Sequence, residues 1–230
     1  MSNTTVLGQR LKSVAQQVRE GAVLADIGTD HGYLPLFLLK SGRIATAHLC
    51  DINEGPLASA RSNLAAEGLC DRVQFHLCDG ASVLEGLGIT DYAIAGMGGE
   101  LIADIIEHAP HLHIPGVRLI LQPMTKQAHL RGYLASSGFD ILSERYSFDE
   151  GKYYVVIVCE YRGTIRELSP IEAELGAPSV LDEDRDHYLG YIRGKERSLK
   201  KTIEGKILGG VDYATESEIL EAIREKIKEV

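Results

Sequence analysis

The sequence lacks tryptophan, has only four cysteines, and contains no hydrophobic run near the ~20 residues that a membrane-spanning helix needs. No basic and apolar leader segment opens the chain. The cysteines, which show no C-x-x-C spacing and are predicted to be mostly buried free thiols, are Cys50, Cys70, Cys78 and Cys159. These absences predict a cytoplasmic protein that makes no contact with a membrane.

An excess of basic residues is also missing. With 33 acidic and 24 basic residues, the chain has a net charge of −9, which argues against indiscriminate binding to polyanions. Any contact with nucleic acid therefore requires a local basic face. The chain is 230 residues long and 44% hydrophobic, so it can form one full core plus an appendage.

Two classes of chemistry find no support in the sequence. There is no Ser-His-Asp order with a nucleophile elbow, so hydrolysis is not indicated. His108, His111 and His113 lie close together, but their segment contains two prolines and no accompanying cluster of acids or cysteines. We therefore expect no metal site there.

The most informative segment is VLADIGTDHGYLP at residues 23–35. A short apolar run, typical of a buried parallel strand, leads through a glycine-containing turn into an apolar helix. Gly28 and Gly32 permit a tight bend and a close approach of a ligand to the backbone. A strand, a glycine turn and a helix N-terminus together form the ligand crevice of an open α/β sheet.

The acids of this turn indicate which ligand binds. A dinucleotide-binding turn has three glycines in G-x-G-x-x-G, whereas this turn has two, and Asp26 and Asp30 would repel a pyrophosphate. The carboxylates suit a cationic ligand, and S-adenosylmethionine carries both an ammonium and a sulfonium group. Alternatively, Asp30 caps the following helix.

Three further predicted strands end in residues suited to a nucleoside. Asp51 can accept hydrogen bonds from a ribose diol, in NAD and S-adenosylmethionine alike. The Asp79-Gly80 pair could accept from an adenine amino group or form a simple turn. The fourth strand leads into GMGGE at residues 96–100, whose backbone could hold a base or the methionine part of the cofactor. Met97 could instead belong to the core and Glu100 could be a first-turn acid.

An amphipathic helix and a strand hairpin complete the predicted sheet. The helix buries an apolar stripe formed by Leu7, Leu11, Val14 and Val18. Arg10 lies off that stripe and either is solvated or faces the mouth of the ligand site. Strands over 140–148 and 153–161, joined by a short glycine-containing connection, predict an antiparallel hairpin. This layout is that of a class I methyltransferase, a Rossmann-like α/β sheet with one antiparallel strand.

The composition changes beyond Gly163, where we expect two helices. Breaks are predicted at Ser169-Pro170 and Ala177-Pro178. A first helix is expected from about Asp182 to Gly209-Gly210, and a second helix is expected to begin with a capping box formed by Thr215 and Glu218. The apolar stripes of the two helices comprise Tyr188, Ile192, Leu199, Ile203 and Ile207, and Leu220, Ile223, Ile227 and Val230. The result is an antiparallel, coiled-coil-like helical hairpin.

The first of these helices also carries a run of basic residues. Such a run is usually a solvated face, but here it is the plausible track for phosphates in an acidic chain. Its members are Arg193, Lys195, Arg197, Lys200, Lys201 and Lys206.

The segments RLKSVAQQV, ADIGTDHGYLP, CDIN, CDG and AGMGGE, in this order and followed by the helical hairpin, resemble the TrmK family of bacterial tRNA methyltransferases. The resemblance covers nearly the whole chain. It implies methyl transfer from S-adenosylmethionine to N1 of the adenine at position 22 of tRNA. It also implies a Rossmann-like domain over residues 1–162 and a coiled-coil-like helical domain over residues 163–230 that helps to hold tRNA. No obligate protein partner is evident.

The resemblance also assigns residues to roles. Cofactor contacts are expected at Asp26, Gly28, Thr29, Asp30, His31, Gly32, Asp51, Ile52, Asn53, Asp79, Gly80, Ala95, Gly96, Met97, Gly98 and Gly99. RNA contacts are expected at Arg10, Arg193, Lys195, Arg197, Lys200 and Lys201. Because adenine N1 is already a neutral nucleophile, catalysis is expected to depend on positioning, with Asp30 as first candidate and Arg10 and Glu100 as others. The alternatives are methylation of another RNA, a protein or a small molecule, and a non-catalytic nucleotide-binding module.

Overall fold

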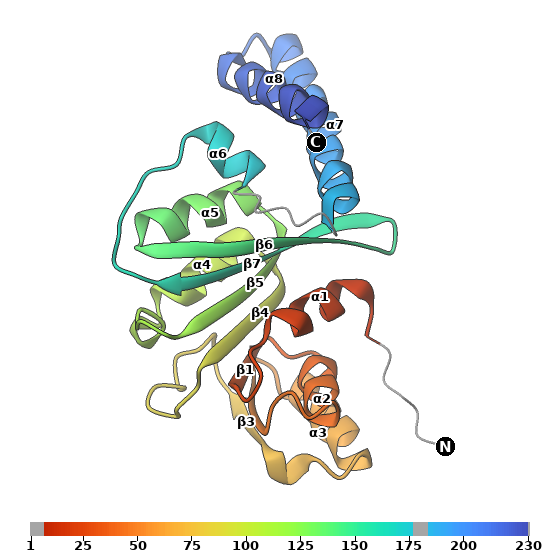
Figure 1. Ribbon diagram of the computed structural model, residues 1–230, viewed down its shortest axis with the longest axis vertical. Helices are drawn as coiled ribbons and strands as arrows, with labels where there is room; N and C mark the ends of the chain where they lie inside the picture. Colours follow the sequence, from red (N-terminus) through yellow and green to blue (C-terminus); the bar gives the residue numbers. More distant parts are fainter. Residues whose placement is uncertain (1–6, 177–183, 230) are drawn as a thin grey trace.

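The computed structural model describes residues 7–176 and 184–229. Across these residues, seven strands form one sheet in the order β3-β2-β1-β4-β5-β7-β6 (Figure 1). Five strands are parallel: β1 (Val23–Ile27), β2 (Thr46–Asp51), β3 (Val73–Leu77), β4 (Asp91–Gly98) and β5 (Arg118–Thr125). The hairpin strands β6 (Phe139–Asp149) and β7 (Lys152–Tyr161) pair with each other, and β7 runs antiparallel to β5. The predicted class I methyltransferase sheet is confirmed.

Helices cover both faces of the sheet, and the strands alternate their side chains between two cores. Leu24 of β1 packs with residues of α1 (Gln9–Gln17), α2 (Tyr33–Lys40) and α3 (Glu54–Ala66). Ala25 and Ile27 of the same strand face α4 (Gly99–Glu107) and α5 (Gln127–Ser136) on the other side. Short 3-10 turns, η1 (Cys70–Arg72) and η2 (Pro110–Leu112), precede β3 and β5. A strand buried on both faces explains its continuous apolar sequence.

The predicted boundaries needed small corrections near the site. β4 continues to Gly98 rather than stopping at Ala95, with register shifts against β5 on either side of Met97. Helix α5 begins at Gln127, directly after Lys126, which adopts a left-handed φ of 57° and ends the strand. The predicted stripe of α1 is confirmed, since Leu7, Val14 and Val18 are buried.

The C-terminal part differs more from the prediction. Ser169-Pro170 is the start of a missed helix, α6 (Pro170–Leu175), in which Ser169 and Glu172 form a capping box. The capping box expected at Thr215 is wrong, because α8 (Ala214–Glu229) already begins at the preceding residue. Ile207 of α7 (Arg185–Gly209) is 54% exposed instead of buried. Other predictions fell on Ala177, Pro178, Asp182 and Val230, which lie outside the described residues.

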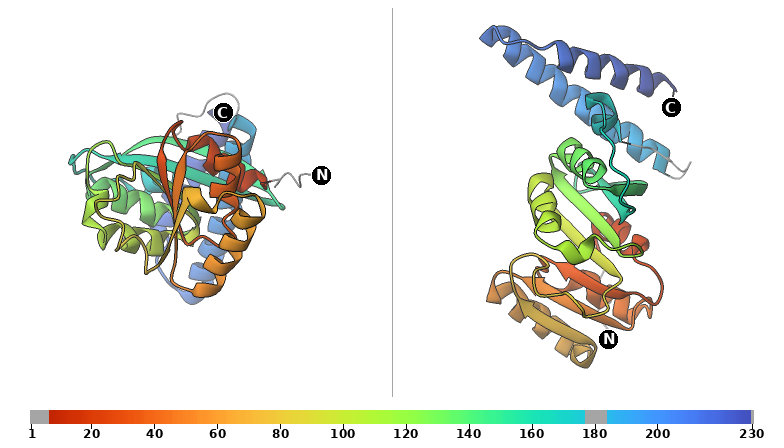
Figure 2. Two further views of the ribbon diagram at one scale, coloured as in Figure 1. Left: turned by 90° about the horizontal axis from the view of Figure 1, so that it is seen from below. Right: turned by 90° about the vertical axis from the view of Figure 1, so that its left-hand side faces the viewer.

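The antiparallel pair α7–α8 extends from the end of the sheet opposite to β3 (Figures 1 and 2). A buried ion pair of the α/β part supports helix α6: Arg131 of α5 donates to Glu144 of β6 at 2.6 and 3.0 Å and to the Ala173 carbonyl of α6 at 2.8 Å. The Tyr146 hydroxyl also donates to Glu144, and its ring lies 4.9 Å from that of Tyr188 on α7. The helical part is therefore docked by specific contacts, and the division of the chain at residue 162 stays a prediction.

The cysteines are free; Cys50 and Cys159 are buried, whereas Cys70 and Cys78 are only half-buried. His113 packs against the rings of Phe139 and Tyr161, a structural role. Within the described ranges, His, Cys, Asp and Glu form no group of three that could hold a metal ion. No helix in those same ranges combines the length and apolar character needed to cross a membrane.

Candidate functional site

The turn after β1 is fixed by backbone contacts with the neighbouring strand. The amides of Gly28 and Thr29 both donate to the Cys50 carbonyl of β2, at 2.8 and 3.0 Å. Gly28 has a φ of 72°, and a Cβ there would lie 2.1 Å from Met97 Cε. A Cβ at Gly32 would lie 2.9 Å from Ala60 Cβ on α3. Both glycines have a positive φ, which confirms the predicted tight bend, and Gly32 is in addition closely packed; the approach of a ligand to this backbone stays a prediction.

Asp26 is a buried carboxylate at the carboxyl end of β1, with 8% of its surface exposed. Burial raises the pKa of Asp26 to about 6, the Thr29 hydroxyl opposes this shift, and the Asp51 carboxylate adds to it. Asp51 lies at the end of the adjacent strand β2, where one of its oxygens accepts from the Asn53 amide at 2.7 Å. Two neighbouring carboxylates in a partly desolvated position create a site with a strong preference for a cation.

A small pocket of about 200 Å³ opens beside this turn. It is lined by Arg10, Asp26, Ala95 and residues 28–34. The Asp30 side chain is 80% exposed and lies 3.4 Å from His31 Nε2. The His31 carbonyl accepts from the Asn63 side chain of α3 at 2.9 Å, which holds the loop in place. Gly32 occupies the N-cap of α2 without a side-chain cap, so the capping alternative for Asp30 is wrong.

Arg10 lies on the wall of this pocket, and its position at the mouth of the ligand site stays a prediction. Its Nη1 donates to Gln122 Oε1 at 2.7 Å, and its backbone amide donates to Asp149 of the β6–β7 hairpin at 3.0 Å. Gln122 is fully buried, and the same oxygen accepts from the Gly96 amide at 3.1 Å. One carboxamide thus fixes both a cationic side chain and the glycine-containing end of β4.

Gly99 of GMGGE allows two chain segments to pack closely together. A Cβ at Gly99 would lie 2.4 Å from the Lys126 carbonyl oxygen, so α4 begins directly against the segment that follows β5. Glu100 is exposed and forms an ion pair of 3.3 Å with Lys126 Nζ. This pair lies at the start of α4, and Glu100 is not among the residues that line the 200 Å³ pocket.

The structure brings most of the predicted cofactor residues to one edge of the sheet, but not into one cavity. Asp26, Asp51 and Asp79 follow the adjacent strands β1, β2 and β3. Asp79 and Ile52 are exposed, and the 200 Å³ pocket does not include them. The predicted set therefore follows the carboxyl ends of the strands, and the 200 Å³ pocket contains only part of it.

Sequence reasoning missed Gln122. A polar residue that follows the apolar strand segment Leu119-Ile120-Leu121 was the available signal, because a buried carboxamide requires hydrogen-bonding partners. The identity of those partners, Arg10 and Gly96, could not have been read from local sequence.

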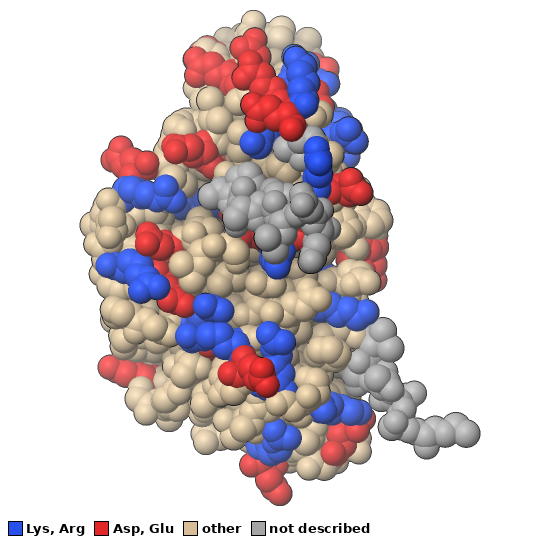
Figure 3. Space-filling view, in the orientation of Figure 1, with Lys and Arg blue, Asp and Glu red and all other residues tan. Residues whose placement is uncertain are grey.

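The predicted basic track is partly neutralised. Lys195 pairs with Glu174, Lys200 with Glu196 at 2.6 Å, and Lys206 with Glu216 at 2.5 Å. Among the described residues, the other three basic side chains of the run make no ion pair; they are the exposed Arg193, Arg197 and Lys201. Acidic and basic groups are interspersed on the face seen in Figure 3, and a dense acidic group lies at the top, where α8 is found.

The residues at these strand ends suit S-adenosylmethionine better than a dinucleotide. Asp26 is suited to an ammonium group because its buried carboxylate has no cationic partner among the described residues. Asp51 is placed to accept from a ribose diol. Nothing in the two-glycine turn provides the third close approach that a pyrophosphate requires.

Comparison with known proteins gives a consistent result. A family model described as a methyltransferase domain matches residues 7–157. The tRNA (adenine(22)-N(1))-methyltransferase of Bacillus subtilis is 35% identical over 158 residues, which are 69% of this chain and 66% of that protein.

Solved structures match over nearly the full length. A Streptococcus pneumoniae protein in complex with S-adenosyl-L-methionine is 33% identical, with a TM-score of 0.81 over 95% of this chain and 98% of that chain. TrmK of M. capricolum in complex with S-adenosyl-homocysteine is 26% identical, with a TM-score of 0.78 over 96% and 98% of the two chains.

Proposed function

The chain belongs to the TrmK family of S-adenosylmethionine-dependent tRNA methyltransferases, and we propose that it methylates N1 of the adenine at position 22 of bacterial tRNA. The observation that carries this proposal is the buried Asp26 carboxylate beneath a two-glycine turn, next to the Arg10 wall of the pocket. A cytoplasmic location is part of the proposal, since tRNA is the substrate.

The chain's own residues bind and orient the reactants. We assign the ammonium group of the cofactor to Asp26 and the ribose diol to Asp51, with the Gly28–Gly32 turn providing backbone contacts. When bound, S-adenosylmethionine supplies an electrophilic methyl group. Adenine N1 has an available lone pair, so the protein does not need to remove a proton from it, and correct alignment is the main contribution to rate.

Asp30 is the residue that we assign to the target base. Its exposed carboxylate borders the pocket and can accept from the exocyclic amine of adenine. It also favours the positive charge that develops on the purine. Arg10, held by Gln122, forms the opposite wall and is suited to a phosphate or to the edge of the base. Glu100 is a weaker candidate because it pairs with Lys126 outside this pocket.

One assay tests the reaction and its alternatives. Purified protein, radiolabelled S-adenosylmethionine and unmodified tRNA are expected to give N1-methyladenine, and a tRNA with guanine at position 22 is expected to give none. Transfer to a small molecule or a protein without RNA would instead support a different methyltransferase. Cofactor binding with no transfer to any of these acceptors would support a non-catalytic module.

Substitution of Asp30 tests its assigned role. An Asp30→Ala variant is expected to bind cofactor and tRNA with affinities near the wild type but to transfer the methyl group about 100-fold more slowly. Wild-type rates in this variant would remove Asp30 from the mechanism, while leaving the overall reaction as proposed.

A further inference from the structure

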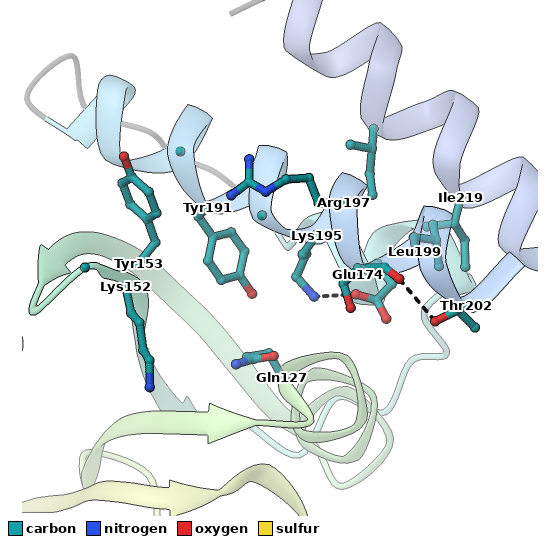
Figure 4. A pocket seen from close by; sticks show the side chains of 15 residues that line it. Gln127, Lys152, Tyr153, Glu174, Tyr191, Lys195, Arg197, Leu199, Thr202 and Ile219 are labelled. Carbon is teal, nitrogen blue, oxygen red and sulfur yellow. Dashed lines mark hydrogen bonds and ion pairs between the residues drawn. The ribbon is translucent and has the colours of Figure 1, made fainter. Parts of the chain in front are cut away.

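A second cavity lies apart from the 200 Å³ pocket beside the Gly28–Gly32 turn. It has a volume of about 500 Å³ and is formed by the β6–β7 turn, the first residue of α5, and helices α6, α7 and α8 (Figure 4). This size suits a ligand as large as a nucleotide. The residues that decide its character are Tyr153, Gly190, Gly194 and Arg197.

One wall of the cavity is aromatic. Tyr153 is 37% exposed and Phe148, across the hairpin, is 43% exposed, with their ring centroids 4.7 Å apart. Tyr153 lies directly against the α7 backbone, because a Cβ at Gly190 would come within 2.1 Å of its ring. The ring is therefore held in a fixed orientation with part of its surface open. An exposed, rigid aromatic surface is the feature that nucleic-acid-binding proteins use to stack an unpaired base.

Gly194 has no role in the packing that the structure shows. A Cβ at this position would meet only the end of the Arg197 side chain, at 3.9 Å. Glycine inside a helix costs about 1 kcal/mol relative to alanine. At Gly194 no neighbouring atom of the chain requires a glycine and so offsets this cost. At Gly190, one turn earlier, the Tyr153 ring does require one. Gly205 of the same helix also has no close neighbour, but Gly194 lines the cavity and Gly205 does not, so we interpret Gly194 as leaving room for an external group.

The cavity also carries positive charge that the protein does not neutralise. Lys152 and Arg197 line it, are exposed, and form no ion pair with any described residue. Figure 4 shows Arg197 extending from α7 toward Tyr153. Lys195 is different, since its ammonium group pairs with Glu174. Two cations beside an aromatic surface, in a chain with a net charge of −9, indicate a nucleotide phosphate with an attached base.

The cavity shares a sheet edge with the proposed methyl-transfer site. Gln127, which lines it, comes shortly after β5, whose end contains the Gln122 that holds Arg10. Asp149, at the start of the hairpin turn, accepts from the Arg10 amide at 3.0 Å. The hairpin that presents Tyr153 is thus tied to Arg10, and one RNA strand can contact both places.

Resting on the proposed function, we propose that this cavity binds a second, unpaired nucleotide of the tRNA substrate. Its base stacks on Tyr153 over Gly194, and its phosphate lies between Lys152 and Arg197. Extrusion of the target adenine removes stacking from its neighbours in the strand, and the cavity replaces that interaction for one of them. The site therefore contributes to binding of the flipped-out form of the RNA.

Paired variants test this inference. Tyr153→Leu and Gly194→Leu are each expected to raise the Kd and KM for tRNA about tenfold, with cofactor affinity unchanged. Tyr153→Phe keeps the ring, and Gly205→Leu places the same side chain on an α7 glycine where a Cβ would meet nothing within 4 Å. Both controls are expected to stay within about twofold of the wild type. Lys152→Ala is expected to reduce the slope of log K for tRNA binding against log salt concentration by about one, the loss of one phosphate contact.

The outcomes separate this inference from the function on which it rests. Wild-type protein that transfers no methyl group to tRNA would contradict the proposed function. Wild-type transfer combined with an unchanged tRNA KM in both Tyr153→Leu and Gly194→Leu would contradict the nucleotide site alone. An equal loss in Gly205→Leu would show that the effect comes from the helix and would also overturn the inference.

Discussion

Gln122 and Arg10 are 112 residues apart in the sequence, yet Gln122 Oε1 accepts from Arg10 Nη1 at 2.7 Å. The same oxygen accepts from the Gly96 amide at 3.1 Å, and Gln122 is fully buried. This single side chain therefore sets the distance between the N-terminal helix and the end of β4. Both elements line the 200 Å³ pocket, through Arg10 and Ala95.

Loss of the Gln122 acceptor is expected to slow methyl transfer without lowering the affinity for the cofactor. In Gln122→Met the shape is approximately kept, but Arg10 and Gly96 both lose their partner, and misplacement by about 1 Å can cost 100-fold in rate. We therefore expect kcat on tRNA to fall by about 10- to 100-fold. The Kd for S-adenosylmethionine is expected to stay near the wild-type value. Gln122→Glu keeps an acceptor for Arg10 and is expected to retain more activity. Equal rates in Gln122→Met and the wild type would contradict this positioning role.

Asp26 is expected to stabilise the complex and destabilise the free protein. Burial raises the pKa of Asp26 from 3.8 to about 6, so between these values the folded state binds more protons than the unfolded state. The free energy of unfolding therefore falls as the pH rises through this window, by at most about 3 kcal/mol, and stays level above it. Removing the carboxylate removes this cost.

The Asp26→Asn variant tests both halves of that statement. In urea unfolding without cofactor, it is expected to be more stable than the wild type at pH 7.5, and the advantage is expected to shrink toward pH 4. Its affinity for S-adenosylmethionine is expected to fall at least tenfold, because a charge-assisted hydrogen bond is lost. If the stability gained by the variant over the wild type is no larger at pH 7.5 than at pH 4, burial of the Asp26 carboxylate does not carry the cost assigned to it.

The sequence allowed the prediction of features that depend on neighbouring residues. The strand, turn and helix over residues 23–35 follow from an apolar run, two spaced glycines and a second apolar run, and Gly28 and Gly32 form the predicted bend with positive φ values. The hairpin followed from two strand patterns separated by Glu150-Gly151, both of which have positive φ values. These signals lie within a few positions of one another, so no tertiary information was needed.

Features set by tertiary contacts could not be predicted. The pairing of Glu100 with Lys126 depends on how α4 meets the segment after β5, and the neutralisation of Lys195 depends on the missed helix α6. The basic run of α7 therefore looked more uniform in the sequence than in the structure. Gln122 was overlooked for the same reason, because its partners come from two distant segments.

Gly99 is expected to be irreplaceable, whereas its neighbour Gly98 is not. A Cβ at Gly99 would lie 2.4 Å from the Lys126 carbonyl oxygen, which is backbone and cannot rotate away. A Cβ at Gly98 would be 3.4 Å from the Thr125 hydroxyl, an ordinary contact. Gly99→Ala is expected to lose about 2 kcal/mol or more in thermal or urea unfolding, and Gly98→Ala less than about 1 kcal/mol. Equal stability of the two variants would show that α4 can move away from β5 without penalty.

The buried Arg131–Glu144 pair, through which α5 and β6 support helix α6, is expected to be the ion pair whose loss destabilises the protein most. Both side chains are at most 1% exposed, and Arg131 also donates to the Ala173 carbonyl of α6 at 2.8 Å. Arg131→Met leaves the Glu144 carboxylate buried without its cation, which typically costs about 3–5 kcal/mol. Arg118→Met is the matched control, because the Arg118–Glu160 pair is more exposed and is expected to contribute about 1 kcal/mol or less. Urea unfolding followed by circular dichroism measures both, and similar losses in the two variants would contradict the special role of Arg131.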